Sequence, residues 1–517
     1  MATKPMFLVY EGGKLNEYVP PTPTQISKVY MHSQWVNSGT VSDRTLFKSN
    51  SNYHVANSVA RCTVYFKGFS SYTLMCRSNG EVNYDYLEVG NLNVSNISRN
   101  GSNKISFKGN ASASTYTAVT WTGLNEDTEY FVELIYSKDS SADSNEDRGF
   151  FYIPEGEVTY ADEPTPEIYG VEWDGSSTTR WTRTDDAASF SDPTPSYKNG
   201  SSYTTGSSPF DTISPWKDMV TSERTGGTMV AIPKFYYKWT KTGSAMKLQI
   251  ANTAVTGFSV SPAHRNRGLG EKDVIYVGRY HCASSTYKST TGVQPQRGGL
   301  KKYRSTFRTA IRNLDSNIYM YDYACLETIW MLYLVEFADW NSQAKIGGGC
   351  STSGSVMTMG YTDNMNYHTG TTASSIGATV YGGTQYRNIE GLWDNVADYI
   401  DGIMCDSSYL WAILNPSSYA DITASPAVNA FTLPSSTSGW ISSYGFSSAT
   451  NFDWLIFPNA LSGSANTYTT DYYQKWYIPT VGGYYSNQSQ SGLFYLNFVH
   501  NDSDGISYTG SRIVEYP

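Results

Sequence analysis

Apolar and polar residues alternate along much of the chain, which is the period-two pattern of half-buried β-strands. In the segment 61–67, one face carries Cys62, Val64 and Phe66. In the segment 129–136, the apolar face carries Tyr130, Val132, Leu134 and Tyr136. About seven such strands, separated by Asn/Ser/Gly-rich turns, predict a β-sandwich of immunoglobulin or jelly-roll type over residues 26–154.

Helical periodicity is confined to two segments. Residues 302–314 place Phe307, Ile311 and Leu314 at helical spacing. Residues 324–340 also predict a helix, and the glycines at 347–349 beyond it are expected to stop it. One side of this helix carries the apolar residues Leu326, Ile329, Trp330, Tyr333, Leu334 and Phe337. The segment 228–239 predicts one continuous strand. The chain is therefore expected to be mainly β with a few helices, an α+β fold.

Two proline-rich segments divide the chain. Pro20, Pro21 and Pro23 form a stiff spacer, and Pro164 and Pro166 end a second one. We predict an N-terminal attachment segment with its spacer (1–25), the β-sandwich (26–154), a linker (155–166) and a C-terminal domain (167–517). The sandwich is interpreted as a spacer, and sugar binding through exposed aromatic residues is the alternative. No internal repeat is evident.

Composition excludes several classes of protein. The 517 residues are 15% aromatic and only 16% charged, which argues against disorder. The net charge of −9 lacks the cationic footprint of a nucleic-acid-binding protein. The apolar stretch 329–335 is far shorter than the ~20 residues that span a bilayer, so no membrane insertion is expected. Residues 6–10 are too few for the apolar region of a signal peptide, so synthesis in a cytoplasm without export by that route is expected.

The residues that usually bind metals or react as nucleophiles are scattered. Six cysteines, at 62, 76, 282, 325, 350 and 405, form no CxxC pair and are expected as free thiols, with Cys62 and Cys76 pointing inward from neighbouring strands. The six histidines stand alone. Asp502 and Asp504 are typical of a calcium loop, but Ser511 occupies the place of its closing Glu. No catalytic residue, metal or cofactor is predicted.

Three motifs, the last of them spread over three short segments, carry a family resemblance. Residues 386–402 resemble the GNVWEWxxD signature, although Asp394, Ala397, Asp398 and Tyr399 replace its Gly, Trp, Glu and Trp. Residues 229–238 resemble the MVxIPKFYYK strand of phage tail proteins. Residues 481–487, 492–497 and 510–514 are similar to the VGG…GxFYLNxNN…GxR frame of retroelement-diversified variable regions. The resemblance, covering roughly 167–517, is to the C-type-lectin-like fold shared by formylglycine-generating enzymes and the variable proteins of diversity-generating retroelements.

The resemblance implies a C-type-lectin-like domain with a variable region at 481–514. In that family the frame residues pack and the intervening positions face the ligand. Carried over to this sequence, the ligand-binding positions are Tyr484, Tyr485, Asn487, Ser489, Val499, His500, Asp502, Asp504, Ile506 and Tyr508.

The residue types in this region support binding independently of the family. Of the 27 residues from 484 to 510, 15 are Tyr, Ser, Gly or Asn, and none is Lys, Arg, Glu, Met or Trp. Antibody paratopes favour this mixture because Tyr offers a large contact area at a small entropic cost. The alternative is that these loops are the irregular rim of a β-rich protein.

The sequence thus predicts a phage virion receptor-binding protein, a tail-fibre tip or head fibre located on the virion surface. Its expected partners are a bacterial surface protein or glycan and, through the N-terminal segment, other virion proteins. A homo-oligomer is also expected, with a trimer suggested by analogy alone. A structural decoration protein and a bacterial adhesin remain alternatives. An oxidase of the formylglycine-generating type is disfavoured because no cysteine follows Cys405.

Overall fold

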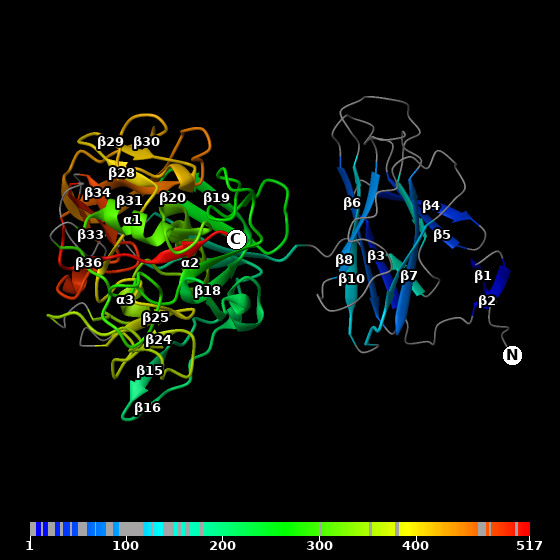
Figure 1. Ribbon diagram of the computed structural model, residues 1–517, viewed down its shortest axis with the longest axis horizontal. Coiled ribbons are helices and arrows are strands. Elements are labelled where there is room, and N and C mark those ends of the chain that lie inside the picture. Colours follow the sequence, from blue (N-terminus) through cyan, green and yellow to red (C-terminus); the bar gives the residue numbers. More distant parts are fainter. Residues whose placement is uncertain are drawn as a thin grey trace. The chain divides into compact units, whose positions relative to one another are not determined.

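A computed structural model describes each of the two parts of the chain. The described residues are 7–11, 14–18, 26–31, 35–41, 44–49, 59–67, 69–78, 86–92, 117–125, 128–137, 149–152, 157–160 and, in 166–517, all except 176–178, 300–301, 351–353, 378–381, 464–471, 475–476 and 502–504. The chain divides into two compact units, Met1–Thr165 and Pro166–Pro517, and the boundary falls inside the segment 155–166 (Figure 1). Strands dominate both units, which confirms the mainly β, α+β class.

The described strands of the first unit form two five-stranded sheets and a short hairpin. The hairpin comprises β1 (Phe7–Glu11) and β2 (Lys14–Tyr18). One sheet has the order β12 (Glu157–Tyr160), β3 (Ile26–Met31), β6 (Val59–Lys67), β10 (Tyr130–Ser137), β8 (Tyr86–Leu92). The other has the order β4 (Trp35–Val41), β5 (Arg44–Ser49), β11 (Gly149–Tyr152), β7 (Ser71–Ser78), β9 (Thr117–Thr122).

Aromatic residues join the two sheets of this unit. Phe66 on β6 stacks on Tyr72 of β7 with ring centroids 3.7 Å apart. Because β6 and β7 belong to different sheets, the prediction that Cys62 and Cys76 lie on neighbouring strands was wrong. Cys76 is buried as expected, whereas the side chain of Cys62 lies outside the described residues. Strand β12 pairs with β3, so the linker is shorter than the predicted 155–166.

The described strands of the second unit form five sheets. Two of them frame its core: β14 (Thr182–Asp185), β13 (Ile168–Trp173), β20 (Ala245–Ala251), β19 (Tyr236–Thr242), β21 (Ser259–Val260); and β17 (Thr221–Arg224), β18 (Gly227–Pro233), β22 (Val274–Gly278), β37 (Ile513–Glu515), β23 (Ile318–Met320). The segment 228–239 is therefore two strands in two sheets, not one, because the ladder breaks after Pro233.

Three further sheets carry the remaining strands. The largest, called here the seven-stranded sheet, has the order β32 (Ile456–Ser462), β31 (Ser438–Phe446), β33 (Tyr472–Gln474), β35 (Leu496–His500), β34 (Ile478–Val481), β27 (Ala397–Tyr399), β36 (Thr509–Gly510). The others are β16 (Ser202–Tyr203), β15 (Ser196–Asn199), β24 (Gly370–Thr371), β25 (Thr384–Tyr386), β26 (Ile389–Glu390); and β28 (Ile403–Cys405), β29 (Tyr409–Ala412), β30 (Val428–Thr432).

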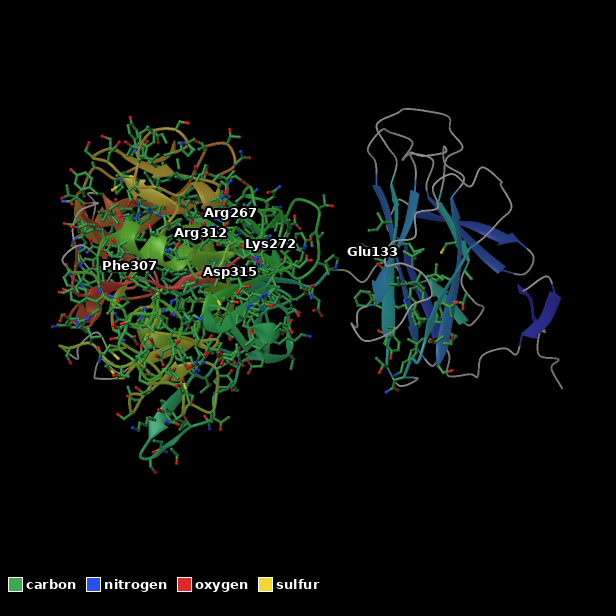
Figure 2. All side chains as sticks on the ribbon, in the orientation of Figure 1. Glu133, Arg267, Lys272, Phe307, Arg312 and Asp315 are labelled. Atoms are coloured by element: carbon green, nitrogen blue, oxygen red, sulfur yellow. The ribbon has the colours of Figure 1, made fainter. Side chains whose placement is uncertain are left out.

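The described residues of this unit include three α-helices: α1 (Arg304–Arg312), α2 (Tyr323–Phe337) and α3 (Ser342–Lys345). Phe307 of α1, labelled in Figure 2, is fully buried. Every residue of α2 is buried, not only the predicted apolar side. The helix ends at Phe337 because Ala338 adopts the left-handed conformation (φ 49°), well before the glycines at 347–349.

Candidate binding surface

Three of the predicted contact tyrosines come together on the second unit. The rings of Tyr484 and Tyr508 stack with centroids 4.0 Å apart and an interplanar angle of 17°. Tyr485 meets Tyr484 edge-on at 5.3 Å. The Tyr508 hydroxyl lies 3.4 Å from His500 Nε2. All four side chains are partly exposed, and together they are called the tyrosine surface below.

Two glycines position the tyrosine surface at the end of β34. Gly482 (φ 80°) and Gly483 (φ 88°) follow Val481 in the left-handed region that favours glycine. A Cβ atom on Gly482 would lie 2.3 Å from the Leu392 carbonyl oxygen, and one on Gly483 would lie 2.5 Å from Ser491 Cβ. The turn therefore requires both glycines, and it directs the next two residues onto the surface.

Hydrogen bonds fix the backbone of the tyrosine pair. The Tyr484 N–H donates to Asn487 Oδ1 at 2.8 Å. The Tyr485 N–H donates to the Asn395 carbonyl at 3.1 Å, and the Gly354 N–H donates to the Tyr485 carbonyl at 3.2 Å. Such a restrained backbone holds aromatic side chains in place before a ligand arrives, which lowers the entropic cost of binding.

A buried polar layer lies beneath the tyrosine surface. Asn497 of β35 donates from Nδ2 to the Tyr495 hydroxyl at 2.8 Å, and both residues are buried. Burial raises the pKa of Tyr495, and burial together with Tyr485 raises the pKa of Tyr484. Both phenols are therefore neutral at physiological pH, so this part of the surface can offer hydrogen-bond donors and ring faces but no phenolate charge.

The other predicted contact residues have different surroundings. Asn487 is half-buried and Ser489 is exposed. Ile506 is only 7% exposed and packs in an apolar cluster with Phe307 and Ile513, so its assignment as a ligand contact is corrected. The side chain of Val499, together with Asp502 and Asp504, lies outside the described residues.

A buried ionic cluster, which the sequence did not predict, links the frame segments. Asp398 accepts from His281 Nδ1 at 2.9 Å and lies 3.3 Å from Arg512 Nε. Burial opposes ionisation of Asp398, but His281 and Arg512 hold its pKa below the usual range. Asp398 and Arg512 belong to two of the segments that carry the family resemblance, and this is the signal that could have pointed to their contact.

The described cysteines are all shielded from solvent. Cys76, Cys282, Cys325, Cys350 and Cys405 are free thiols and are all buried. Burial raises the pKa of the first four, which disfavours the reactive thiolate. Among the described residues, no group of three or more His, Cys, Asp and Glu is arranged to hold a metal ion. In the same part of the chain, no helix is long and apolar enough to cross a membrane.

In comparisons with known proteins, no family model and no curated protein sequence matched this chain.

Glu390 anchors the loop that supports the tyrosine surface. Its carboxylate accepts from the Gly360 N–H at 2.8 Å, from the Thr362 N–H at 2.9 Å and from the Thr362 hydroxyl at 2.6 Å. The same loop is bonded to Asn395, whose Oδ1 accepts from the Met357 N–H at 2.8 Å. Burial raises the pKa of Glu390 to about 7, against the hydrogen bonds from Thr362 and Gly360.

We expect this shift to make stability depend on pH. Between the ordinary pKa of 4.5 and about 7, folded Glu390 binds more protons than unfolded Glu390, so the free energy of unfolding falls as pH rises. The full shift in the pKa of Glu390 corresponds to about 3 kcal/mol of unfolding free energy.

Urea unfolding of the parent protein and of Glu390→Gln at pH 5 and pH 8 tests this pH dependence, because the variant should lose less stability than the parent between the two pH values. Equal losses in the two proteins would contradict the assignment to Glu390. The low pKa values of Asp211 and Asp421, about 2, keep these carboxylates from contributing in this window.

Proposed function

We propose that this protein is a phage virion receptor-binding protein that attaches to a bacterial surface ligand through the tyrosine surface. The observation that carries the proposal is the assembly of Tyr484, Tyr485, His500 and Tyr508 into one partly exposed aromatic cluster. These positions come from three separate segments, namely the turn after β34, the end of β35 and the residue before β36, and the sequence predicts each of them as a position between frame residues.

The geometry suits binding better than catalysis. Stacked and edge-on rings offer large, rigid contact areas, and phenol and imidazole groups add hydrogen bonds. Such residues often dominate binding energy at interfaces. Several copies on one particle would raise avidity by roughly 10²–10⁴ over a single weak site. The C-type-lectin-like fold, the retroelement origin and the virion location belong to this proposal and are supported by the three motif segments.

Replacement of both stacked tyrosines tests the proposal. We expect particles carrying Tyr484→Ala and Tyr508→Ala to adsorb to their propagating host at least tenfold more slowly, because loss of the stacked ring pair costs about 1.4 kcal/mol or more of contact energy. The measurement is the adsorption rate constant, with thermal unfolding of the purified chain as the check on folding.

A matched control comes from a tyrosine elsewhere on the same unit. Tyr409 is 39% exposed, and Tyr409→Ala particles should adsorb normally. If the Tyr484 and Tyr508 variant is folded and adsorbs at the parental rate, the proposal fails and a decoration role is favoured instead.

A further inference from the structure

A shallow groove lies over the adjoining strands β31 and β32 of the seven-stranded sheet. Its volume is about 260 Å³. The lining residues are Ser436, Ser438, Gly439, Trp440, Leu461, Ser462 and Gly463. Within it, Trp440 pairs in the sheet with Ser462, so the indole lies beside a serine on the neighbouring strand.

The register of the sheet shows that Trp440 faces away from the core. Residues paired across neighbouring strands share a face, and successive residues alternate. Gly439 pairs with Tyr473, and Tyr473 pairs with Leu496. Tyr473 and Leu496 are buried in the main core cluster. Trp440 and Ser438 therefore lie on the opposite, outer face, in agreement with a half-buried Trp440 and an exposed Ser438.

The lining defines the chemistry of a ligand. It combines one indole with three serine hydroxyls and contains no Asp, Glu, Lys or Arg. Serine hydroxyls both donate and accept hydrogen bonds, so they match a ligand that also does both. A flat apolar ring face packs well on an indole. A pyranose ring presents such a face together with several hydroxyls, whereas a phosphate or carboxylate ligand would lack a cationic partner among the lining residues.

We propose that this groove binds a neutral carbohydrate, with one sugar ring packed on Trp440 and its hydroxyls bonded by Ser436, Ser438 and Ser462. The assignment follows from the groove alone. It rests on the proposed function only for the source of the sugar, a bacterial surface glycan.

The groove and the tyrosine surface share one face of the sheet. Ser438 pairs with Gln474, and Gln474 pairs with Asn497, so Ser438 and Asn497 point to the same side. Asn497 supports Tyr495 in the layer beneath the tyrosine surface. Strands β31 and β35 are separated by one strand, which corresponds to about 10 Å. An oligosaccharide held at Trp440 can therefore extend towards the tyrosine surface.

Saturation-transfer NMR on the full chain tests the proposal with four probes. These are the neutral trisaccharides chitotriose, mannotriose and maltotriose, and the charged trigalacturonic acid. At least one neutral trisaccharide should receive saturation at millimolar concentration. Trp440→Ala should weaken its binding at least tenfold, whereas Trp440→Phe should keep it within about threefold because a ring face remains.

Two controls separate this proposal from the proposed function. Tyr409→Ala, an exposed tyrosine on β29, should not affect trisaccharide binding. The Tyr484→Ala, Tyr508→Ala protein should still bind the trisaccharide at Trp440 while its particles lose adsorption. The carbohydrate site is overturned if no neutral trisaccharide binds, if only trigalacturonic acid binds, or if a folded Trp440→Ala protein binds as well as the parent.

Discussion

Arg512→Met is expected to destabilise the second unit by about 4 kcal/mol or more, because one buried guanidinium joins several chain segments. Arg512 is fully buried. Its Nη1 donates to the carbonyls of Gly278 and Arg279 at 2.9 and 3.1 Å, and its Nη2 donates to those of Glu390 and Gly391 at 2.9 and 3.1 Å.

The loss has two physical components. Removal of Arg512 leaves Asp398 as a buried carboxylate that keeps its contact with His281 but loses its guanidinium partner. It also leaves four buried carbonyl oxygens without these donors, and methionine fills the volume but supplies no N–H. The segment 506–514 should then loosen, so the effect reaches Tyr508 and the tyrosine surface.

Calorimetric unfolding of the full chain measures this effect, with Arg265→Met as the matched control. Arg265 forms a 2.9 Å ion pair with Asp453, whose side chain is 58% exposed, and pairs at the surface typically contribute about 0.2–1 kcal/mol. We expect the unfolding transition of the second unit to move to a much lower temperature in Arg512→Met and to stay almost unchanged in Arg265→Met. Similar shifts in the two variants would show that Arg512 does not have the joining role described here.

Local pattern predicted most elements, but not the extent of burial. The alternation of apolar and polar residues in 129–136 predicted the strand β10, and the helical spacing of apolar residues in 302–314 predicted the helix α1. The burial of α2 on all sides was not predictable, because it depends on partners that bond its two glutamates. Glu327 accepts from the Ile456 N–H at 2.8 Å, and Glu336 binds Arg387. These partners are 129 and 51 residues away in the sequence.

Positions in the candidate site were predictable where they lie between the frame residues of the resemblance motif at 481–514. The Gly482–Gly483 turn orients Tyr484 and Tyr485, and the same frame led to Tyr508. Ile506 was assigned wrongly because it packs inward, as its side-chain chemistry alone would favour. The Trp440 groove was not predicted, because the alternation of residues 438–442 does not reveal which face of the strand is covered.

A buried ion pair gives the second large expected effect. Arg387 Nη2 lies 2.5 Å from Glu336 Oε1, and its Nε donates to Glu336 Oε2 at 3.0 Å. Arg387 and Asn388 form the two-residue turn between β25 and β26, with positive φ angles of 45° and 68°. Arginine is unfavourable in that conformation, so its contact with α2 offsets a local backbone cost. Glu336→Met or Arg387→Met alone should each destabilise the unit by about 3 kcal/mol.

The double variant discriminates between two physical explanations. If each single loss arises mainly from leaving the other ion buried without its closest partner, then Glu336→Met combined with Arg387→Met should cost less than the sum of the two and recover part of the stability. Arg387 Nη1 also lies 3.0 Å from Asp211 Oδ1, a contact that Glu336→Met leaves in place. Recovery should be incomplete, because the hydroxyls of Tyr386 and Ser208 donate to Glu336 at 3.0 and 2.8 Å and lose this acceptor in the double variant. Urea unfolding of all four proteins measures the coupling, and Glu271→Gln, at the exposed Lys234 pair, is the control. Strictly additive losses would mean that the two side chains stabilise the fold through separate contacts instead of through their pairing.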